Sequence, residues 1–410
     1  MPTADRRLPL AGVRVLDMTR FVAGPFCTSL LADQGAEVVK LERPEGEENR
    51  TLGPMVGDEH GGPVSSYFLR FAKNKKSVCL DLKRPEAGPV LRALLAHADV
   101  LVENFRPGVL ERMGLDWPSL QALNERLIYC TITGFGYENS PLRERGAFTP
   151  VVEALAAATI YHTPDAAPMT AGYPVGDIFP AALAAAGISM ALYRRESDGQ
   201  GARIDMAMFD GMLAMNERAV GVSTMLGRDL LPGIRADIGA APSGVFPAKD
   251  GFVSISVVGE VVWARFCRVL ERPDWAADER LSSGPARSAH EEEVAAVVTE
   301  WLSSRTRSEA VELLAAAGVP AAEVARPTEI TSSAQARARD MIIQYPAYEG
   351  FVPTVTGNPI RFAGEHRREA GAAPVAGEHT QEILQAWGRL DAADVESLLL
   401  AGVAVQRHPG

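Results

Sequence analysis

The sequence predicts an α/β fold, with a large doubly wound, Rossmann-like domain and a smaller α+β second domain. Short β-rich runs alternate with helical stretches in the first half, which is the order of a parallel sheet covered by helices. A loop rich in glycine, proline and alanine then follows residue 226, and a hairpin signal comes next. We therefore predict a large domain over residues 1–226, a small domain over 227–327 and a return to the large domain over 328–410.

The strands of the predicted sheet are short runs rich in β-branched residues. They lie at Val13–Met18, Glu37–Leu41, Asp99–Glu103 and Leu127–Thr133, and helical stretches lie at Pro85–His97 and Ser119–Glu125. Open parallel sheets bind ligands beyond the carboxyl ends of their strands. In this interpretation Arg20, Arg43, Asn104 and the run Gly134-Phe-Gly136 all fall at that edge. The sequence thus predicts a ligand site there.

The later part of the chain predicts a fifth strand, a long helix and the small domain. The strand covers Arg203–Met208, and the helix runs from Phe209 to about Leu226. In the small domain, Lys249-Asp-Gly251 is typical of a hairpin turn between two strands. The elements expected there are strands Val245–Ala248 and Phe252–Val257, and helices Val261–Leu270, Ala289–Ser303 and Arg307–Ala317.

The composition is that of an ordinary enzyme with a large core, since 47% of its 410 residues are hydrophobic. A net charge of −11 argues against general affinity for nucleic acid or anionic membranes. The 4 cysteines form no CxxC motif and have no histidines at ligand spacing, so we expect neither a metal site nor disulfides. The start of the chain shows no apolar signal segment, and the longest apolar run, around Ile178 to Tyr193, is best explained as a core helix. These features predict a cytoplasmic protein.

Asp177 is the candidate nucleophile. Gly176 precedes it, and Ile178–Ala181 opens an alanine-rich helix with a proline in its first turn. We therefore expect Asp177 at or near the N-cap, where unpaired N–H groups and the helix dipole stabilise an ionised carboxylate. A cap with no further role is the simpler interpretation of this segment alone, so its meaning depends on the rest of the chain.

Six motifs occur along the chain in a specific order and spacing. They are Leu10–Pro25, Gly35–Pro44, Asn74–Lys83, Val102–Gly108 with Arg112, Gly176-Asp177, and Gly377–Glu382. On these motifs the chain resembles, from Val13 to its end, the family III CoA-transferases. That group includes formyl-CoA transferase, and its relatives include the α-methylacyl-CoA racemases.

The resemblance implies a function and a set of site residues. Asp177 would carry the acyl group covalently, with Glu153 near it, and coenzyme A would be a substrate rather than a permanently bound cofactor. The positions implied for CoA binding are Arg20, Arg43, Leu80, Lys83, Asn104, Phe105, Arg112 and Met208. Gly239 and Ala240 fall in the implied lid, whose backbone N–H groups would stabilise oxyanions. The implied partners are an acyl-CoA donor and a carboxylate acceptor, and the implied assembly is an interlocked homodimer.

Departures from the family pattern bear on the substrate. Arg20 stands at a position that is often histidine, and Val22 at one that is glutamine in formyl-CoA transferase, which argues against formate and oxalate as the specific substrates. Arg20 and Arg235 have the charge to pair with the distal carboxylate of succinate, malate, mesaconate or itaconate. Contact with CoA phosphate or solvent explains both arginines equally well, so the acid stays open.

Three other functions can be compared with CoA transfer. A racemase needs a proton carrier on each face of the α-carbon, but the run Arg145-Gly146-Ala147-Phe148 lacks the histidine of the related racemases, and His162 is more simply a surface imidazole. A nicotinamide dehydrogenase needs a G-x-G-x-x-G turn, which is missing after the first strand. A non-catalytic CoA-binding protein stays open, although the retention of Asp177 favours the transferase.

Overall fold

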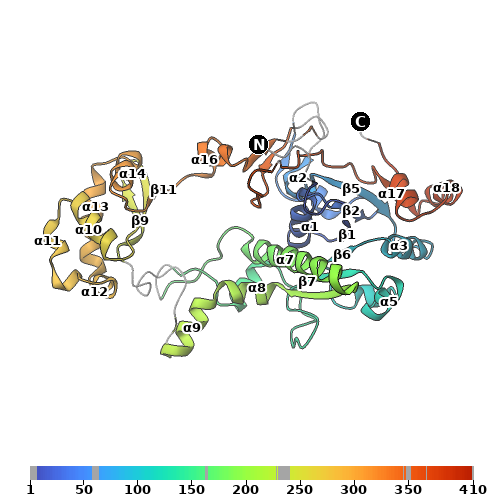
Figure 1. Cartoon of the computed structure of the whole chain (residues 1–410), viewed down its shortest axis with the longest axis horizontal. Coiled ribbons are helices and arrows are strands. Elements are labelled where there is room, and N and C mark those ends of the chain that lie inside the picture. The colour runs from blue at the N-terminus through green and yellow to red at the C-terminus, as the bar shows by residue number, and fades with distance from the viewer. Residues whose placement is uncertain are drawn as a thin grey trace. The chain divides into compact units, whose positions relative to one another are not determined.

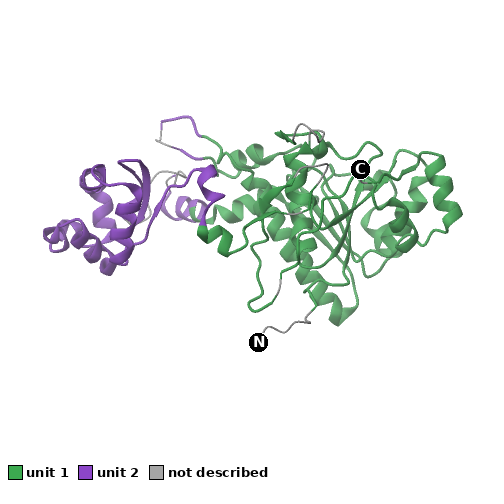
Figure 2. Ribbon diagram, turned by 90° about the horizontal axis from the view of Figure 1, so that it is seen from above, with its two compact units in different colours: residues 1–159, 169–218, 334–410 green, residues 160–168, 219–333 purple. Residues whose placement is uncertain are grey.

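A computed structural model describes residues 7–57, 64–161, 165–227, 229, 241–344, 346–347, 352–365 and 367–408. The chain forms two compact units, shown in different colours in Figure 2. The larger unit comprises Met1–Thr159, Met169–Arg218 and Ala334–Gly410, and the smaller one comprises Ile160–Pro168 and Ala219–Ser333. In this division the end of the chain belongs to the larger unit. The main segment of the smaller unit begins eight residues before the predicted boundary at 227 and ends six residues after the one at 327.

The larger unit is built on a seven-stranded sheet with the order β14-β5-β2-β1-β6-β7-β8. All neighbouring pairs are parallel except β14 with β5. The strands are β1 (Arg14–Met18), β2 (Glu37–Glu42), β5 (Lys75–Leu80), β6 (Val100–Glu103), β7 (Ile128–Thr133), β8 (Ala202–Ala207) and β14 (Ala404–Val405). The predicted α/β class and parallel sheet are confirmed. β5 and β14 had no counterpart among the predicted strands.

Helices cover both faces of this sheet (Figure 1). Alternate side chains of each strand point to opposite faces, so Val15 packs into one core and Leu16 into the other. α1 (Ala23–Asp33) and α7 (Val175–Asp198) form the first layer. The second layer comprises α3 (Ala87–Ala96), α5 (Trp117–Leu123), α17 (Thr380–Ala386) and α18 (Ala392–Leu400). The C-terminal segment therefore completes one of the two cores.

Short elements complete this unit. They are η1 (Glu48–Arg50), β3 (Met55–Val56), β4 (Val64–Ser65), α2 (Ser66–Ala72), α4 (Val109–Arg112), α6 (Thr149–Leu155), α8 (Met208–Met215), α16 (Ala334–Ala338), β12 (Ile342–Gln344) and β13 (Thr354–Thr356).

The helix predicted from Phe209 to Leu226 is two helices, α8 and α9 (Glu217–Leu226). Asn216 lies between them, and its side-chain amide donates to the carbonyls of Ala156 and Ala157 at the end of α6.

α7 is long and apolar enough to cross a bilayer by length and composition. Ala181, Ala184 and Ile188 on one side of it are fully buried against the sheet and α1. A helix packed in this way belongs to the core of the unit, as the sequence predicted.

The smaller unit has its own core around an antiparallel sheet of β9 (Ser243–Ala248), β10 (Gly251–Ser256) and β11 (Ala321–Glu323). Ala248 pairs with Gly251, so Lys249 and Asp250 form the tip of the predicted hairpin. The helices are α10 (Glu260–Val269), α11 (Pro273–Ala276), η3 (Glu279–Leu281), α12 (Gly284–Ala289), α13 (Glu291–Ser303), α14 (Arg307–Ala316) and α15 (Pro327–Ile330). Stacked Trp263 and Trp275, with ring centroids 5.8 Å apart, lie in this core.

Candidate functional site

A cleft of about 350 Å³ opens beyond the carboxyl ends of β1, β2, β5 and β6 in the larger unit. It brings together five of the predicted CoA-binding residues, namely Arg20, Arg43, Leu80, Lys83 and Phe105. Each of them ends a strand or follows one closely. Parallel strands deliver their ends to the same edge of the sheet, which is why residues so distant in sequence meet here.

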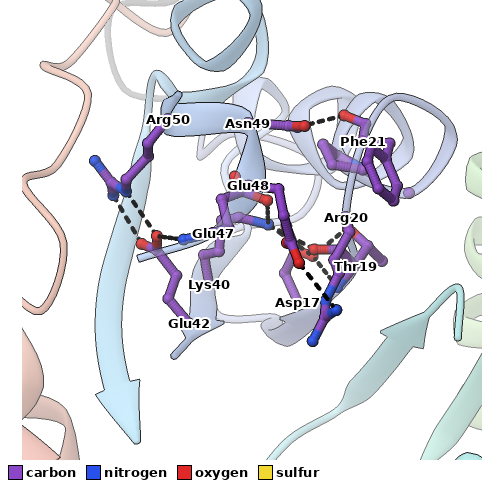
Figure 3. Close-up of polar contacts among 12 residues, drawn as sticks. Asp17, Thr19, Arg20, Phe21, Lys40, Glu42, Glu47, Glu48, Asn49 and Arg50 are labelled. Carbon is purple, nitrogen blue, oxygen red and sulfur yellow. Dashed lines mark hydrogen bonds and ion pairs between the residues drawn. The ribbon is translucent and has the colours of Figure 1, made fainter. Parts of the chain in front are cut away.

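The two arginines of the cleft share one carboxylate. Arg20 Nη1 and Arg43 Nη2 each lie 3.3 Å from Glu48 Oε1, and Figure 3 shows Arg20 and Glu48 facing one another. The Arg20 guanidinium also lies over the Phe105 ring, 5.1 Å from its centroid. Both arginines are partly exposed, so a phosphate that enters the cleft can replace Glu48 as their partner.

Asn104 positions the cleft through the backbone. Its side chain accepts a hydrogen bond from Arg20 N and donates one to Arg20 O, both at 2.8 Å. The next residue, Phe105, donates its N–H to Glu103, which also accepts from the Tyr129 hydroxyl. Burial raises the pKa of Glu103 to about 7. This group of contacts fixes the loops after β1 and β6 relative to each other.

Two predicted CoA residues lie away from this cleft. Arg112 is an exposed residue at the end of α4, and Met208 is buried in the core formed with α1 and α7. The predicted lid residues Gly239 and Ala240 fall outside the described residues, as do Arg235 and His162. Their roles stay predictions.

A second cavity of about 500 Å³ in the same unit contains both predicted catalytic carboxyl groups, Asp177 and Glu153. Most of its wall is apolar or aromatic, with Phe21, Leu52, Tyr67, Phe148 and Tyr173 among its residues. Phe21 follows Arg20 in the chain, so the β1–α1 loop contributes to both cavities. A molecule with a charged nucleotide and a reactive acyl end has complementary surfaces in these two places.

Asp177 lies near the N-cap of α7, as predicted, but it is not the cap itself. α7 begins at Val175 with Pro174 as its N-cap, so Asp177 is the third helical residue. Gly176 is required by packing, because a Cβ there would lie 2.8 Å from Val152 Cγ2. The close approach of α6 to α7 places Thr149 beside Asp177, and its hydroxyl donates to Asp177 Oδ2.

The expected lowering of the Asp177 pKa is wrong in direction. Burial raises the pKa of Asp177, and the Thr149 hydrogen bond and the Arg70 charge oppose that rise only in part. The pKa of Glu153 is also raised, first by burial and further by the charge of Asp177, while the Ala171 backbone opposes it. The position of Asp177 at a helix start favours its carboxylate anion and would lower its pKa. Burial removes water from the carboxylate, and this desolvation changes the pKa more than the helix does.

A network of buried charged side chains fixes the start of the β1–α1 loop. Asp17 is fully buried and accepts from Lys75 Nζ at 3.0 Å, Thr28 Oγ1 at 2.6 Å and Thr19 N at 2.9 Å. Lys40 Nζ donates to Thr19 O at 2.8 Å and pairs with Glu47, as seen in Figure 3. Although burial alone would raise the pKa of Asp17, the two lysines hold it well below its ordinary value.

Sequence reasoning missed this network and also Arg70, a residue of α2 whose charge acts on Asp177. Asp17 and Lys40 were recognised as parts of motifs, and the signal for their role was a charged residue inside an otherwise apolar strand. Within the described ranges, no group of three histidine, cysteine, aspartate or glutamate residues is arranged to hold a metal ion.

The sequence profile of CoA-transferase family III matches residues 10–380, which is most of the chain. The chain belongs to CoA-transferase family III. It is 34% identical over 388 residues to the succinate–glutarate CoA-transferase of Agrobacterium fabrum, covering 93% of this chain and 96% of that one. It is also 34% identical over 385 residues to the succinyl-CoA:mesaconate CoA-transferase of Haloarcula hispanica, with 92% and 96% covered.

A solved structure supports the same assignment. The crystal structure of a CaiB/BaiF family protein from Brucella suis superposes with a TM-score of 0.81 at 31% identity, covering 92% of this chain and 99% of that one. The predicted class, a family III CoA-transferase, is therefore confirmed. The similarity spans both units, so both belong to the family's architecture.

Proposed function

We propose that this family III CoA-transferase moves CoA from an acyl-CoA to a dicarboxylic acid through a covalent intermediate on Asp177. The observation that carries the proposal is the placement of Asp177 and Glu153 in one mostly apolar cavity, which shares the β1–α1 loop with the cleft of Arg20, Arg43 and Lys83. The relatives in Agrobacterium fabrum and Haloarcula hispanica, named for succinate, glutarate and mesaconate, support the class of acid.

The first half-reaction transfers CoA to the enzyme. The Asp177 carboxylate attacks the thioester carbonyl, the C–S bond breaks, and CoA leaves as a thiolate with the donor acyl group held in a mixed anhydride. The thiolate then attacks the Asp177 carbonyl carbon, and the donor leaves as a free carboxylate. The second half reverses this order: the acceptor carboxylate displaces the thiolate from Asp177, and the thiolate attacks the acceptor carbonyl. Asp177 is regenerated as a carboxylate, so charge and atoms balance.

The neighbours of Asp177 suit this chemistry. Thr149 fixes the carboxylate by donating to Oδ2, which leaves Oδ1 for attack. The apolar walls keep water away from an anhydride that it would hydrolyse. With its raised pKa, Glu153 is more readily neutral, which limits its repulsion of the nucleophile. Backbone N–H groups of residues 239 and 240 are the proposed oxyanion donors, as the sequence predicted.

The arginine proposed from the sequence for the acid is better assigned to CoA. Arg20 lies in the cleft beyond the strand ends with Phe105 and Glu48, while Val22 lines the cavity of Asp177. We therefore assign Arg20 and Arg43 to the phosphates of CoA, and the Asp177 cavity to the acyl groups.

Removing one cleft cation should weaken CoA binding. We expect Arg43→Ala to raise the Kd for CoA about tenfold at low salt, with a smaller effect at high salt because the lost interaction is electrostatic. Arg84→Ala is the matched control, since Arg84 is exposed nearby and pairs with Glu86 outside the cleft. Calorimetry at two salt concentrations measures both. Equal affinity for Arg43→Ala, Lys83→Ala and the unmodified enzyme would place the nucleotide elsewhere.

A covalent species should be trapped at Asp177 when the enzyme is mixed with succinyl-CoA and no acceptor. Hydroxylamine attacks an anhydride or thioester but leaves a free carboxylate intact, so peptide mapping locates the label. Because the pKa of Asp177 is raised and the anion is the nucleophile, labelling should fall as pH drops, with a midpoint above the ordinary aspartate value of about 3.9.

The same incubation separates the alternatives. A label on Glu153 or Cys130 would refute the assignment to Asp177, and no label with any donor would favour a non-catalytic CoA-binding protein. Repeating it in D₂O with a 2-methylacyl-CoA tests the racemase. Ala147 stands where the racemases carry histidine, so we expect no α-deuterium by NMR at catalytic rates.

A further inference from the structure

We propose that Arg70 binds the non-reacting carboxylate of the dicarboxylic acid and so selects dicarboxylates over monocarboxylates. This inference rests on the proposed role of Asp177 as the acyl carrier. It assigns a function to a side chain that no motif in the sequence had indicated.

α2 holds Arg70 next to the Asp177 cavity. Ser65 caps this helix by accepting from Tyr67 N and Phe68 N, which fixes its first turn. The Arg70 guanidinium lies over the Tyr67 ring, 4.1 Å from its centroid, and over the Phe71 ring at 4.8 Å. Tyr67 lines the cavity of Asp177, so the guanidinium lies over a side chain that forms part of the wall of that cavity. Aromatic contacts on two sides restrict where the guanidinium can lie.

Two donors of this guanidinium have no partner. Arg70 Nε and Nη2 are buried and make no hydrogen bond to any residue that the structure describes. These nitrogens form the side-on fork of an arginine, which matches the two oxygens of a carboxylate. Arg50 shows this geometry in the same molecule, since its Nε and Nη2 each donate to an oxygen of Glu42 at 2.7 Å (Figure 3). A carboxylate is therefore the chemical partner that fits Arg70.

The charge of Arg70 acts on the reacting group, although the two do not form an ion pair. The Arg70 charge lowers the pKa of Asp177, against the larger effect of burial. Among the described residues, Arg70 and Asp177 do not pair directly with each other. A short acid with carboxylates at both ends can place one on Asp177 and the other on the fork.

The walls of the cavity make this pairing selective. Phe21, Leu52 and Phe148 offer no hydrogen bonds to a second carboxylate, and burying that charge unpaired is costly. The Arg70 fork offsets this cost for a dicarboxylate. A monocarboxylate has no group to place there and leaves the two nitrogens without a partner.

The test compares dicarboxylate and monocarboxylate acceptors in three enzymes. Arg70→Met keeps the length and apolar stem of the side chain, and Arg70→Lys keeps its charge but loses the fork. We expect Arg70→Met to lower kcat/KM for succinate and glutarate about 100-fold, and for butyrate by less than threefold. Arg70→Lys should fall between. Arg194→Met, at an exposed ion pair on α7, is the control and should change neither acid.

Two further readouts keep the outcomes distinct. If Arg70 acts only by lowering the pKa of Asp177, Arg70→Met should lose the same fraction of its activity with both acids. The pH midpoint of labelling should then rise by the same amount for each. That result would overturn the proposal. If Arg70 only supports the fold, Tm falls and both acids are affected alike, which also contradicts it. Labelling of Asp177 by acetyl-CoA, which lacks a second carboxylate, should persist in Arg70→Met. The covalent mechanism is tested separately with succinyl-CoA, because absence of that label in the unmodified enzyme would refute the mechanism and not only the role of Arg70.

Discussion

Asp177→Asn should lower kcat for CoA transfer at least 1000-fold while leaving CoA affinity within about twofold, a barrier increase of about 4 kcal/mol or more. The amide is nearly the same size as the carboxylate and can still accept the Thr149 hydrogen bond, so the cavity should keep its shape. It cannot form the anhydride, because an amide oxygen is a far weaker nucleophile. Initial rates with succinyl-CoA and a panel of acids measure the first effect, and calorimetry measures the second.

The matched control is Asp210→Asn. Asp210 is also the third residue of a helix, α8, and burial raises its pKa, but it does not line the Asp177 cavity. We expect that variant to keep activity within about twofold. Retention of more than about 1% of the rate by Asp177→Asn would count heavily against the covalent role, since it corresponds to a barrier change below about 3 kcal/mol.

Asp17→Asn should lower the free energy of unfolding by about 3–5 kcal/mol, the range for breaking a buried ion pair from one side. The substitution leaves the buried ammonium groups of Lys75 and Lys40 without the carboxylate that they face at 3.0 Å and 3.9 Å. Adding Lys75→Met to Asp17→Asn should recover part of the loss. Urea unfolding followed by fluorescence and circular dichroism gives these differences.

The pH dependence of Asp17 has a definite sign. Its folded-state pKa is depressed, so its contribution to stability is complete above the unfolded-state pKa of about 3.9 and is lost as pH falls below it. Glu86→Gln, in an exposed pair with Arg84, is the surface control and should change stability little. A loss below about 1 kcal/mol for Asp17→Asn would mean that the network stabilises little.

The prediction of the sheet succeeded where β-branched and other apolar residues recur along a strand. β1, β2, β6 and β7 were found to within one residue at each end, because their alternate side chains fill two cores. β5, which begins with Lys75 and Lys76, was not predicted. Lys75 is buried by the network that its charge completes, so the strand is stabilised by partners on other strands, which its own pattern does not reveal.

By itself, the sequence determined that the sheet is parallel and that Arg20 and Arg43 lie at the carboxyl edge of its strands, because parallel strands end at the same edge. Lys83, which follows the unpredicted strand β5, and Phe105 were assigned to the CoA site only by the resemblance to the family. Tertiary structure alone decided the environment of Asp177. α6 and α7 converge there with the β1–α1 loop and Tyr67 of α2, segments separated by up to about 150 residues, and their packing removes water from the carboxylate. Desolvation then outweighs the local helix effect and raises its pKa, and the same packing brings Glu153 and the charge of Arg70 to bear on it.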